Sequence, residues 1–259
     1  MQGDLVETRP GLPVLGTFID AVNWDDSRHR ILGWAAQRQS RMVCLCNVHS
    51  VVTALREPRF RQVLARADMA TPDGAPIAWA MRRLGILRQE RISGPDLMWQ
   101  LLRDAQGQHL QVYFYGSCAS TLERLRTAVR TACPRLEIVG MHAPPYRLLQ
   151  PAEQQEITAS INASGANLVF VGLGCPKQES WMAAQLGTVR AVMLGVGAAF
   201  DFYAGVVRRA PPWMQRHGFE WLYRLGQEPR RLAPRYLVTN SIFALALSRQ
   251  LMAKRKAGA

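Results

Sequence analysis

The tetrapeptide Thr71-Pro72-Asp73-Gly74 holds a carboxylate between a proline and a glycine, directly before an apolar pattern that predicts a helix from about Ala75. Proline fixes one backbone dihedral angle and glycine frees the next, so this turn can hold the side chain of Asp73 in one direction. A carboxylate at the start of a helix is also stabilised by the helix dipole. The local sequence therefore leaves two roles open for Asp73, a structural helix cap and a positioned catalytic base.

Three glycine turns follow short apolar runs and precede helix-like patterns. They are Gly116-Ser117, Gly172-Leu173-Gly174-Cys175-Pro176-Lys177-Gln178-Glu179 and Gly195-Val196-Gly197-Ala198-Ala199-Phe200-Asp201. Glycine lets a phosphate approach the backbone, the free N–H groups of a helix start bind it, and Lys177 could add a positive charge. The second turn is neither a Walker P-loop nor a complete GxGxxG fingerprint, because Lys177 occupies the place of the third glycine. Turns that only allow close packing explain the glycines equally well.

A cation and an acid flank another turn, in Arg91-Ile92-Ser93-Gly94-Pro95-Asp96. Asp96 is predicted to cap a helix that runs from Leu97 to Ala105. Arg91 is the better candidate for ligand binding, because a guanidinium grips carboxylates and phosphates through two parallel hydrogen bonds. The alternative role for Arg91 is a surface ion pair.

Near-continuous apolar runs alternate with amphipathic patterns in the part of the chain before Gly205. The runs predict strands over 41–46, 110–115, 136–140, 167–171 and 191–194, and the patterns predict helices over about 120–132 and 178–186. Such strands are typical of a parallel sheet that helices cover on both faces. The predicted fold is therefore α/β, with a Rossmann-like, mostly parallel sheet that binds ligands at the carboxyl ends of its strands, where the glycine turns lie.

The net charge of +13 is concentrated near the end of the chain. Residues 205–259 contain eleven Lys or Arg but only two acidic residues, which accounts for nine of the thirteen net positive charges. We therefore expect an α/β body over 1–204 and a basic, helical C-terminal appendage over 205–259. Its anionic partner is nucleic acid, anionic lipid or a phosphorylated substrate.

The appendage mixes aromatic residues with arginines over 219–236, and an apolar patch over 241–247 precedes Arg249, Lys254, Arg255 and Lys256. This composition is typical of an interfacial helix with a basic flank, and equally of a docked C-terminal helix with a solvated charge run. The apolar patch is far shorter than the roughly 20 residues that span a bilayer, so we expect no transmembrane helix.

The five cysteines, an odd number, are interpreted as reduced thiols of a cytosolic protein. Cys44-Leu45-Cys46 has no second Cys/His pair at zinc-site spacing, so no metal site is predicted. The sequence has no Asp-x-Asp pair that would hold a divalent ion under a nucleotide diphosphate, since Asp25-Asp26 is an adjacent pair in an expected loop. It also has no Gly-x-Ser-x-Gly nucleophile elbow and no N-terminal signal pattern.

Six motifs occur in one order along the chain: Thr71-Pro72-Asp73-Gly74, Arg91-x-x-Gly94-x-Asp96, Gly172-x-Gly174-x-Pro176-Lys177-Gln178-Glu179, Gly195-Val196-Gly197-x-x-Phe200-Asp201, Arg209-Ala210-Pro211 and Glu220-Trp221-x-x-Arg224. Together they resemble the WecG/TagA/CpsF glycosyltransferases (family 26), and the resemblance spans about Leu15 to Tyr236. It implies a bacterial enzyme that moves a sugar from a UDP-sugar to an undecaprenyl-diphosphate-linked acceptor, with inversion at the anomeric carbon and without a metal or another cofactor. It also implies a Rossmann-like body and a C-terminal appendage that reaches the membrane and helps to complete the site.

Site residues carry over by motif. Asp73 matches the general base proposed for the family, and Asn47, Arg91 and Gln178 match pocket positions. The other candidates are Gly116, Gly172, Gly174, Lys177, Glu179, Gly195, Gly197 and Asp201 for substrate binding, and Arg224, Arg231 and Arg235 for the diphosphate or the membrane.

Two points qualify this assignment. If Asp73 also caps its helix, the helix dipole keeps it ionised, and it acts as a weak base through its position rather than through a raised pKa. Members of the family often have threonine where this chain has Leu45; if that threonine touches the sugar or the nucleotide, the donor contact is altered here.

The expected reaction is a single displacement in which Asp73 takes the proton of an acceptor hydroxyl, while arginines and helix N-terminal amides stabilise the leaving UDP. N-acetylmannosamine, its uronic acid and glucose all suit the resemblance, in the synthesis of a bacterial cell-surface polysaccharide or exopolysaccharide.

The expected location is cytoplasmic, peripheral on the inner face of the cell membrane. The expected partners are the UDP-sugar donor, a polyprenyl-diphosphate-linked glycan acceptor and an anionic membrane surface, without nucleic acid. The sequence leaves open whether the chain forms a homo-oligomer.

A basic nucleic-acid-binding protein on a Rossmann-like body is the main alternative, since DNA and anionic lipid both attract positive charge. It accounts for the charge but gives Pro-Asp-Gly and Pro-Lys-Gln-Glu no role. A nicotinamide oxidoreductase is disfavoured by the incomplete glycine fingerprint and by the lack of a clear ribose-binding acid after it.

Overall fold

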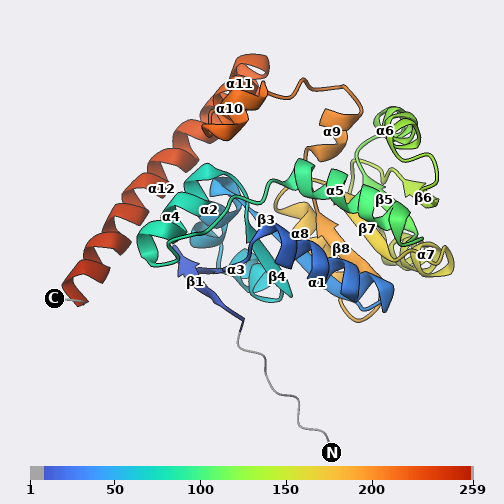
Figure 1. Cartoon of the computed structure of the whole chain (residues 1–259), viewed down its shortest axis with the longest axis horizontal. Helices are drawn as coiled ribbons and strands as arrows, with labels where there is room; N and C mark the ends of the chain where they lie inside the picture. The colour runs from blue at the N-terminus through green and yellow to red at the C-terminus, as the bar shows by residue number, and fades with distance from the viewer. Residues whose placement is uncertain (1–8, 258–259) are drawn as a thin grey trace, which may run out of the picture.

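A six-stranded parallel sheet forms the centre of the protein (Figure 1). The computed structural model describes residues 9–257. Every neighbouring pair of strands is parallel, which confirms the expected α/β, Rossmann-like fold. Across the sheet the strands lie in the order β4 (Met69–Pro72), β3 (Arg41–Cys46), β8 (Val192–Gly195), β7 (Leu168–Gly172), β5 (Val112–Gly116) and β6 (Ile138–His142).

Alternate residues of the central strands face opposite sides of the sheet. In β7, Val169 and Val171 belong to one apolar core cluster, and Leu168 and Phe170 belong to the other. All four side chains are fully buried, and burying a side chain of this size contributes about 1.5–3 kcal/mol relative to exposure. Because both faces are covered, the strand has a continuous apolar sequence rather than an alternating one.

Helices cover both faces of the sheet. One face packs against α2 (Val48–Arg56), α3 (Pro58–Ala65), α4 (Ala75–Leu84), α7 (Pro151–Ala163) and α8 (Lys177–Gln185), and the other against α1 (Trp24–Ala36), α5 (Gly94–Gly107), α6 (Ala119–Ala132) and α9 (Ala199–Tyr203). Apolar residues three or four positions apart enter the core, as in α4, where Ile77, Met81 and Leu84 are buried. These two layers hold the strand ends in fixed positions.

A two-stranded antiparallel hairpin, β1 (Gly11–Val14) and β2 (Thr17–Asp20), precedes the sheet and was not predicted from the sequence. Leu15 and Gly16 at its turn both have positive φ, 50° and 81°. A two-residue hairpin loop favours this conformation, but leucine rarely adopts it, so the sequence carries little signal for the turn.

The C-terminal segment folds into α10 (Pro212–Arg216), α11 (Glu220–Gln227) and the long α12 (Pro229–Ala257), which confirms its expected helical structure. In Figure 1, α12 runs along one side of the body, beside α2 and α4. Phe243 and Leu247 are buried in the same core cluster as residues of those two helices. The inner face of α12 is therefore part of the core.

Polar side chains fasten the far end of α12. The Gln250 side chain accepts a hydrogen bond from the Leu15 N–H at 3.0 Å and donates one to the Pro13 carbonyl at 2.8 Å. The ammonium group of Lys254 donates to the Leu84 carbonyl at the end of α4. No helix within residues 9–257 has the length and apolar character needed to cross a membrane.

The predicted cap of α5 is wrong. Ser93 is the N-cap residue, and Asp96 lies in the first turn, where its carboxylate binds the guanidinium of Arg209. The helix begins earlier than expected because Gly94-Pro95 forms its start, a position that suits proline.

The predicted loop around Asp25 and Asp26 is also wrong. Both residues lie in the first turn of α1, and the Asn23 side chain caps this helix by accepting a hydrogen bond from the Asp26 N–H at 2.8 Å. Carboxylates are favoured there by the helix dipole, which is the physical reason for the pair.

Candidate active site

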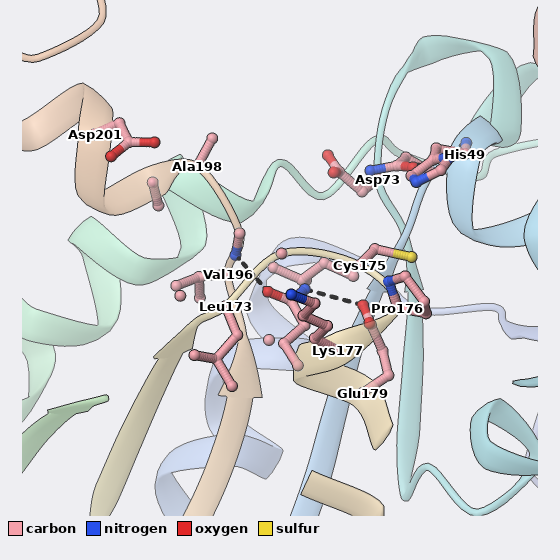
Figure 2. Close-up of a pocket in the computed structure, with 18 of the residues that line it drawn as sticks. His49, Asp73, Leu173, Cys175, Pro176, Lys177, Glu179, Val196, Ala198 and Asp201 are labelled. Carbon is pink, nitrogen blue, oxygen red and sulfur yellow. Dashed lines mark hydrogen bonds between the residues drawn. The ribbon is translucent and has the colours of Figure 1, made fainter. Parts of the chain in front are cut away.

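One large cleft opens at the carboxyl edge of the sheet, with a volume of about 1390 Å³. The segments that follow four neighbouring strands reach it, with Asn47 after β3, Asp73 after β4 and the glycine turns after β7 and β8. Residues of α11 and α12 complete its lining. Figure 2 shows Asp73 close to His49 on one side of the cleft and Asp201 on the other. Parallel α/β sheets bind their ligands at this edge.

The cleft brings together all but one of the residues predicted for the site. It is lined by Asn47, Asp73, Arg91, Gly172, Gly174, Lys177, Gln178, Glu179, Gly195, Gly197, Asp201, Arg224, Arg231 and Arg235. The exception is Gly116, whose φ is 128°. A Cβ atom at this position would lie 2.5 Å from the backbone of Gly172. Gly116 therefore allows β5 and β7 to approach each other, which is the packing role left open above.

Asp73 is the first residue after β4. Its backbone N–H donates to the Cys46 carbonyl at 2.9 Å, which continues the pairing of β3 with β4 by one residue. Gly74, with a φ of 85°, is the N-cap residue of α4, and no side chain caps this helix. Asp73 is thus not a helix cap, and its carboxylate lines the cleft instead.

Burial raises the pKa of Asp73 to about 6, and Glu220 adds to the rise. Arg91, the Asn47 side chain and the backbone N–H of Gly94 oppose it. The expectation of a dipole-stabilised weak base is therefore wrong, because desolvation in the cleft outweighs the stabilising groups. At neutral pH this carboxylate is mostly ionised, yet it is a stronger base than an exposed aspartate.

Asn47 is oriented by the helix it caps. Its Oδ1 accepts hydrogen bonds from the His49 and Ser50 N–H groups at 3.0 and 3.2 Å, and the Ser50 hydroxyl accepts one from the Asn47 N–H at 2.8 Å. This capping box occupies the oxygen and directs the amide NH₂ toward Asp73, where its hydrogen bond lowers the pKa of the carboxylate.

Gln178 and Glu179 are buried at the base of the cleft, each less than 5% exposed. The Gln178 side chain accepts a hydrogen bond from the Gly197 N–H at 3.1 Å and donates one to Oε1 of Glu179 at 2.9 Å, shown as dashed lines in Figure 2. Burial raises the pKa of Glu179. This chain of hydrogen bonds fixes the turn after β8 to the start of α8.

Arg91 enters the cleft from the segment before α5. The Trp24 indole N–H donates to its backbone carbonyl at 3.1 Å, and its guanidinium donates to the Gln215 carbonyl at 3.2 Å. Its Nη1 also lies 3.5 Å from Oε2 of Glu220. Arg91 is therefore positioned mainly by residues of the C-terminal segment.

Three arginines, Arg224, Arg231 and Arg235, line the cleft from α11 and α12, and we call them the arginine wall. The Arg224 guanidinium lies 5.1 Å from the centre of the Phe202 ring. Arg224 and Arg231 both pair with Glu228. Within residues 9–257, the Nε atoms of Arg224 and Arg235 are buried without a hydrogen-bond partner. Buried donors of this kind fit an anionic ligand that would satisfy them.

Asp201 on α9 and Lys177 at the start of α8 add to the charged lining. Burial raises the pKa of Asp201, and Arg224 opposes this rise. In the described part of the chain, no group of three or more His, Cys, Asp or Glu side chains is arranged to hold a metal ion. All five cysteines are free thiols in the structure.

Sequence reasoning missed several cleft residues, among them His49, Arg147 and Glu220. Burial and the charge of Arg235 lower the pKa of His49, so its imidazole is neutral at pH 7. The signal for His49 was its place two residues after Asn47, at the start of a helix that follows a strand. Glu220 was visible in a motif, but its ion pairs connect residues too distant in sequence to be inferred.

Leu45 forms an apolar part of the cleft lining. A Cβ atom on Gly94 would lie 2.8 Å from its Cδ1, so only glycine fits there without movement. In the β3–β4 register Leu45 is opposite Thr71, whose hydroxyl is buried without a partner among the described residues. Within the described residues, Leu45 thus lies beside an unpaired hydroxyl.

Two comparisons with known proteins cover most of the chain. The model of the "Glycosyl transferase WecG/TagA/CpsF family" matches residues 12–257. A protein of Bacillus spizizenii, named N-acetylglucosaminyldiphosphoundecaprenol N-acetyl-beta-D-mannosaminyltransferase, is 31% identical over 215 residues, which cover 83% of this chain and 82% of that protein.

Proposed function

The chain belongs to the WecG/TagA/CpsF family of glycosyl transferases, and from this premise we propose that it transfers N-acetylmannosamine from a UDP-sugar to an N-acetylglucosaminyl-diphosphoundecaprenol acceptor. The name of the Bacillus relative supports this sugar over its uronic acid and glucose, and it supports this acceptor. The observation that carries the proposal is the position of Asp73, a carboxylate with a raised pKa in the same cleft as the arginine wall.

Asp73 is assigned the role of general base. As the acceptor hydroxyl attacks the anomeric carbon, its proton passes to the carboxylate, the bond to the UDP oxygen breaks, and the configuration is inverted. A base with a pKa of about 6 is ionised at neutral pH and still accepts a proton readily. General-base assistance of this kind contributes about 10²–10⁴-fold to the rate.

The arginine wall is assigned to the leaving diphosphate. Within residues 9–257, the Nε–H groups of Arg224 and Arg235 have no hydrogen-bond partner and offer charged donors. Donors fixed in advance at the place where negative charge develops lower the barrier without reorganisation. Gln178 acts indirectly, since it fixes the turn after β8.

The C-terminal segment is assigned to the membrane surface. Its outward side chains are apolar and well exposed: Trp213, Phe219, Trp221, Leu222, Leu237, Val238, Leu245 and Met252. Basic residues lie among them and beyond them, including Arg230, Arg231, Arg249, Arg255 and Lys256. This is the composition of a surface that enters the interfacial layer of an anionic membrane, where the lipid acceptor lies. We therefore treat 205–259 as a membrane-associating appendage on the 1–204 body.

The proposal is tested with purified protein, a short-chain lipid-diphosphate N-acetylglucosamine acceptor and separate UDP-sugars. UDP release and the product mass are recorded for UDP-N-acetylmannosamine, its uronic acid and UDP-glucose. We expect transfer from the first donor, and a loss of about 10²–10⁴-fold in Asp73→Asn with the fold intact. Transfer of another sugar would contradict the donor assignment, and near-normal turnover of the variant would remove Asp73 from the mechanism.

A further inference from the structure

Four charged side chains form a network between the body and the C-terminal segment. Arg209 binds both oxygens of Asp96, at 2.5 and 2.7 Å. The Glu220 carboxylate lies between two guanidinium groups, with Oε2 3.5 Å from Nη1 of Arg91 and Oε1 3.6 Å from Nε of Arg209. Positive and negative groups thus alternate from α5 to α11.

The four side chains of this network are partly buried. The side chains of Arg91, Arg209 and Glu220 are between 20% and 22% exposed, and that of Asp96 is 37% exposed. Charge pairs at such partly buried positions are screened less than pairs on an open surface. The interaction of Glu220 with its neighbours therefore persists at cellular salt concentrations.

Glu220 reaches the catalytic region although it belongs to α11. It lines the same cleft as Asp73 and Arg91, and its nearest cation is Arg91. The other C-terminal partner of Arg91 is the Gln215 carbonyl, so displacement of 209–220 would release the Arg91 side chain from both. The position of this segment consequently decides where the Arg91 charge lies.

We propose that Glu220 is a positioning residue that links the docking of α11 against the body to catalysis by Asp73. When α11 is docked, Glu220 holds the Arg91 guanidinium, and the Asp73 carboxylate remains a strong base. The inference rests on the proposed function, and it gives Glu220 a role that does not require contact with the substrate. When α11 leaves, Asp73 loses a neighbouring anion, and the Arg91 charge is then shared between Asp73 and Asp96, whose Oδ2 lies 4.0 Å from Nη2 of Arg91. The enzyme then has a weaker base whenever its membrane-facing segment is displaced.

The groups that face Asp73 determine the direction in which its pKa changes. Burial and Glu220 raise the pKa of Asp73, while Arg91, the Asn47 side chain and the Gly94 N–H lower it. The nearby Cys46 thiol is neutral because burial raises its pKa, and His49 is neutral because burial lowers its pKa. Removing the Glu220 charge therefore moves the pKa of Asp73 downward.

The first experiment measures the pH dependence of kcat/KM for the full-length protein, with Glu220→Gln, Glu220→Asp and Glu123→Gln as variants. Glu123 is a surface residue of α6 that pairs with Arg126 and does not line the cleft, so its variant controls for the loss of one carboxylate. We expect the acid limb of Glu220→Gln to shift to lower pH by about half a unit or more, with a lower plateau because the base is weaker. We expect Glu220→Asp, which keeps the negative charge, to return the acid limb of the pH profile to its wild-type position. The profile of Glu123→Gln should match that of the wild type. A lowered plateau with an unshifted limb would overturn the proposal, because a structural role alone produces that result.

The second experiment does not need turnover. The Asp73 carboxyl carbon is titrated by NMR in protein labelled with ¹³C at the aspartate carboxyl group, and its signal is identified by its loss in Asp73→Asn. The proposal requires a lower titration midpoint in Glu220→Gln than in the wild type, and an equal or higher midpoint refutes it. If the wild type titrates as expected but transfers no sugar from any donor, the proposed function fails while the role of Glu220 is still tested. Hydrogen exchange of 209–227 in Glu220→Gln completes the test, since we expect faster exchange there and unchanged exchange in the sheet.

Discussion

The backbone N–H of Gly197 donates a hydrogen bond to the side-chain oxygen of Gln178 at 3.1 Å, which joins the turn after β8 to the start of α8. Both ends of the Gln178 amide are used, because its nitrogen donates to Glu179. Replacing Gln178 with alanine removes a partner from the buried Glu179 carboxylate and from the partly buried Gly197 N–H, and a buried polar group left without a partner costs about 1–3 kcal/mol. We expect urea denaturation to show a loss of stability in this range and the KM for the donor to rise more than kcat falls. Gln178→Glu is the matched variant, since it keeps the acceptor for Gly197 but loses the donor to Glu179; full stability in both variants would contradict the role of the amide.

The raised pKa of Asp73 predicts that the stability of the folded protein depends on pH. Because the pKa of Asp73 is about 6 in the folded protein against an ordinary value of 3.8, the folded state binds this proton more tightly than the unfolded state. Its contribution to the free energy of unfolding is fully present below about pH 4 and is lost as the pH rises through about 6. Asp73→Asn should therefore be more stable than the wild type near pH 8, with a difference that vanishes toward pH 4. Denaturation curves of both proteins across this range check the sign, and a stability difference that is the same at all pH values would refute the raised pKa.

Leu45 offers a test of donor recognition. Leu45→Thr places a hydroxyl at the cleft beside the unpaired hydroxyl of Thr71. We expect a lower KM for the donor, by roughly fivefold for one added hydrogen bond of about 1 kcal/mol, at some cost in stability from the smaller side chain. Leu45→Val is the matched control, since it has the same shape as threonine without the hydroxyl. Equal KM values for the two variants would show that position 45 does not contact the donor.

Binding to membranes should depend on exposed apolar side chains of α12. Leu237 and Leu245 are 75% and 56% exposed, and replacing both with glutamine should reduce sedimentation with anionic vesicles while UDP-sugar binding is unchanged. The control replaces both with isoleucine, which retains the apolar surface. Duplex DNA at the same salt concentration separates lipid binding from general attraction to anions, and DNA binding that exceeds vesicle binding would count against the membrane assignment.

Much of the fold could be predicted because buried parallel strands have continuous apolar sequences. The strands around Val43, Phe114, Phe170 and Leu194 were all located within one or two residues. The β1–β2 hairpin was missed, since its turn relies on Leu15 in a conformation that leucine rarely adopts. Local sequence therefore identified the longer buried strands, but it missed the hairpin and also the short buried strand β4, whose four residues run directly into the Asp73 turn.

The site was harder to predict for the same physical reason. Asp73 was located from its flanking residues, but its pKa depends first on burial in the folded cleft and then on the charges of Arg91 and Glu220, which are remote in sequence. The role of Asp96 was misjudged because its partner, Arg209, lies on the C-terminal segment. Electrostatic environments of this kind arise only when the chain has folded, so a motif can identify a carboxylate without giving its strength as a base.

The hydrogen bonds between Gln250 and the hairpin turn affect how the protein is made. Leu15 and Pro13 emerge from the ribosome early, but their partner is synthesised 235 and 237 residues later. Until then the hairpin turn lacks these two hydrogen bonds and the core position of Phe243 is empty, so the nascent body exposes apolar surface while it is translated. The core is complete only when α12 has been released, and we expect a chain truncated before α12 to aggregate through the apolar surface that Phe243 and Leu247 cover in the full-length protein.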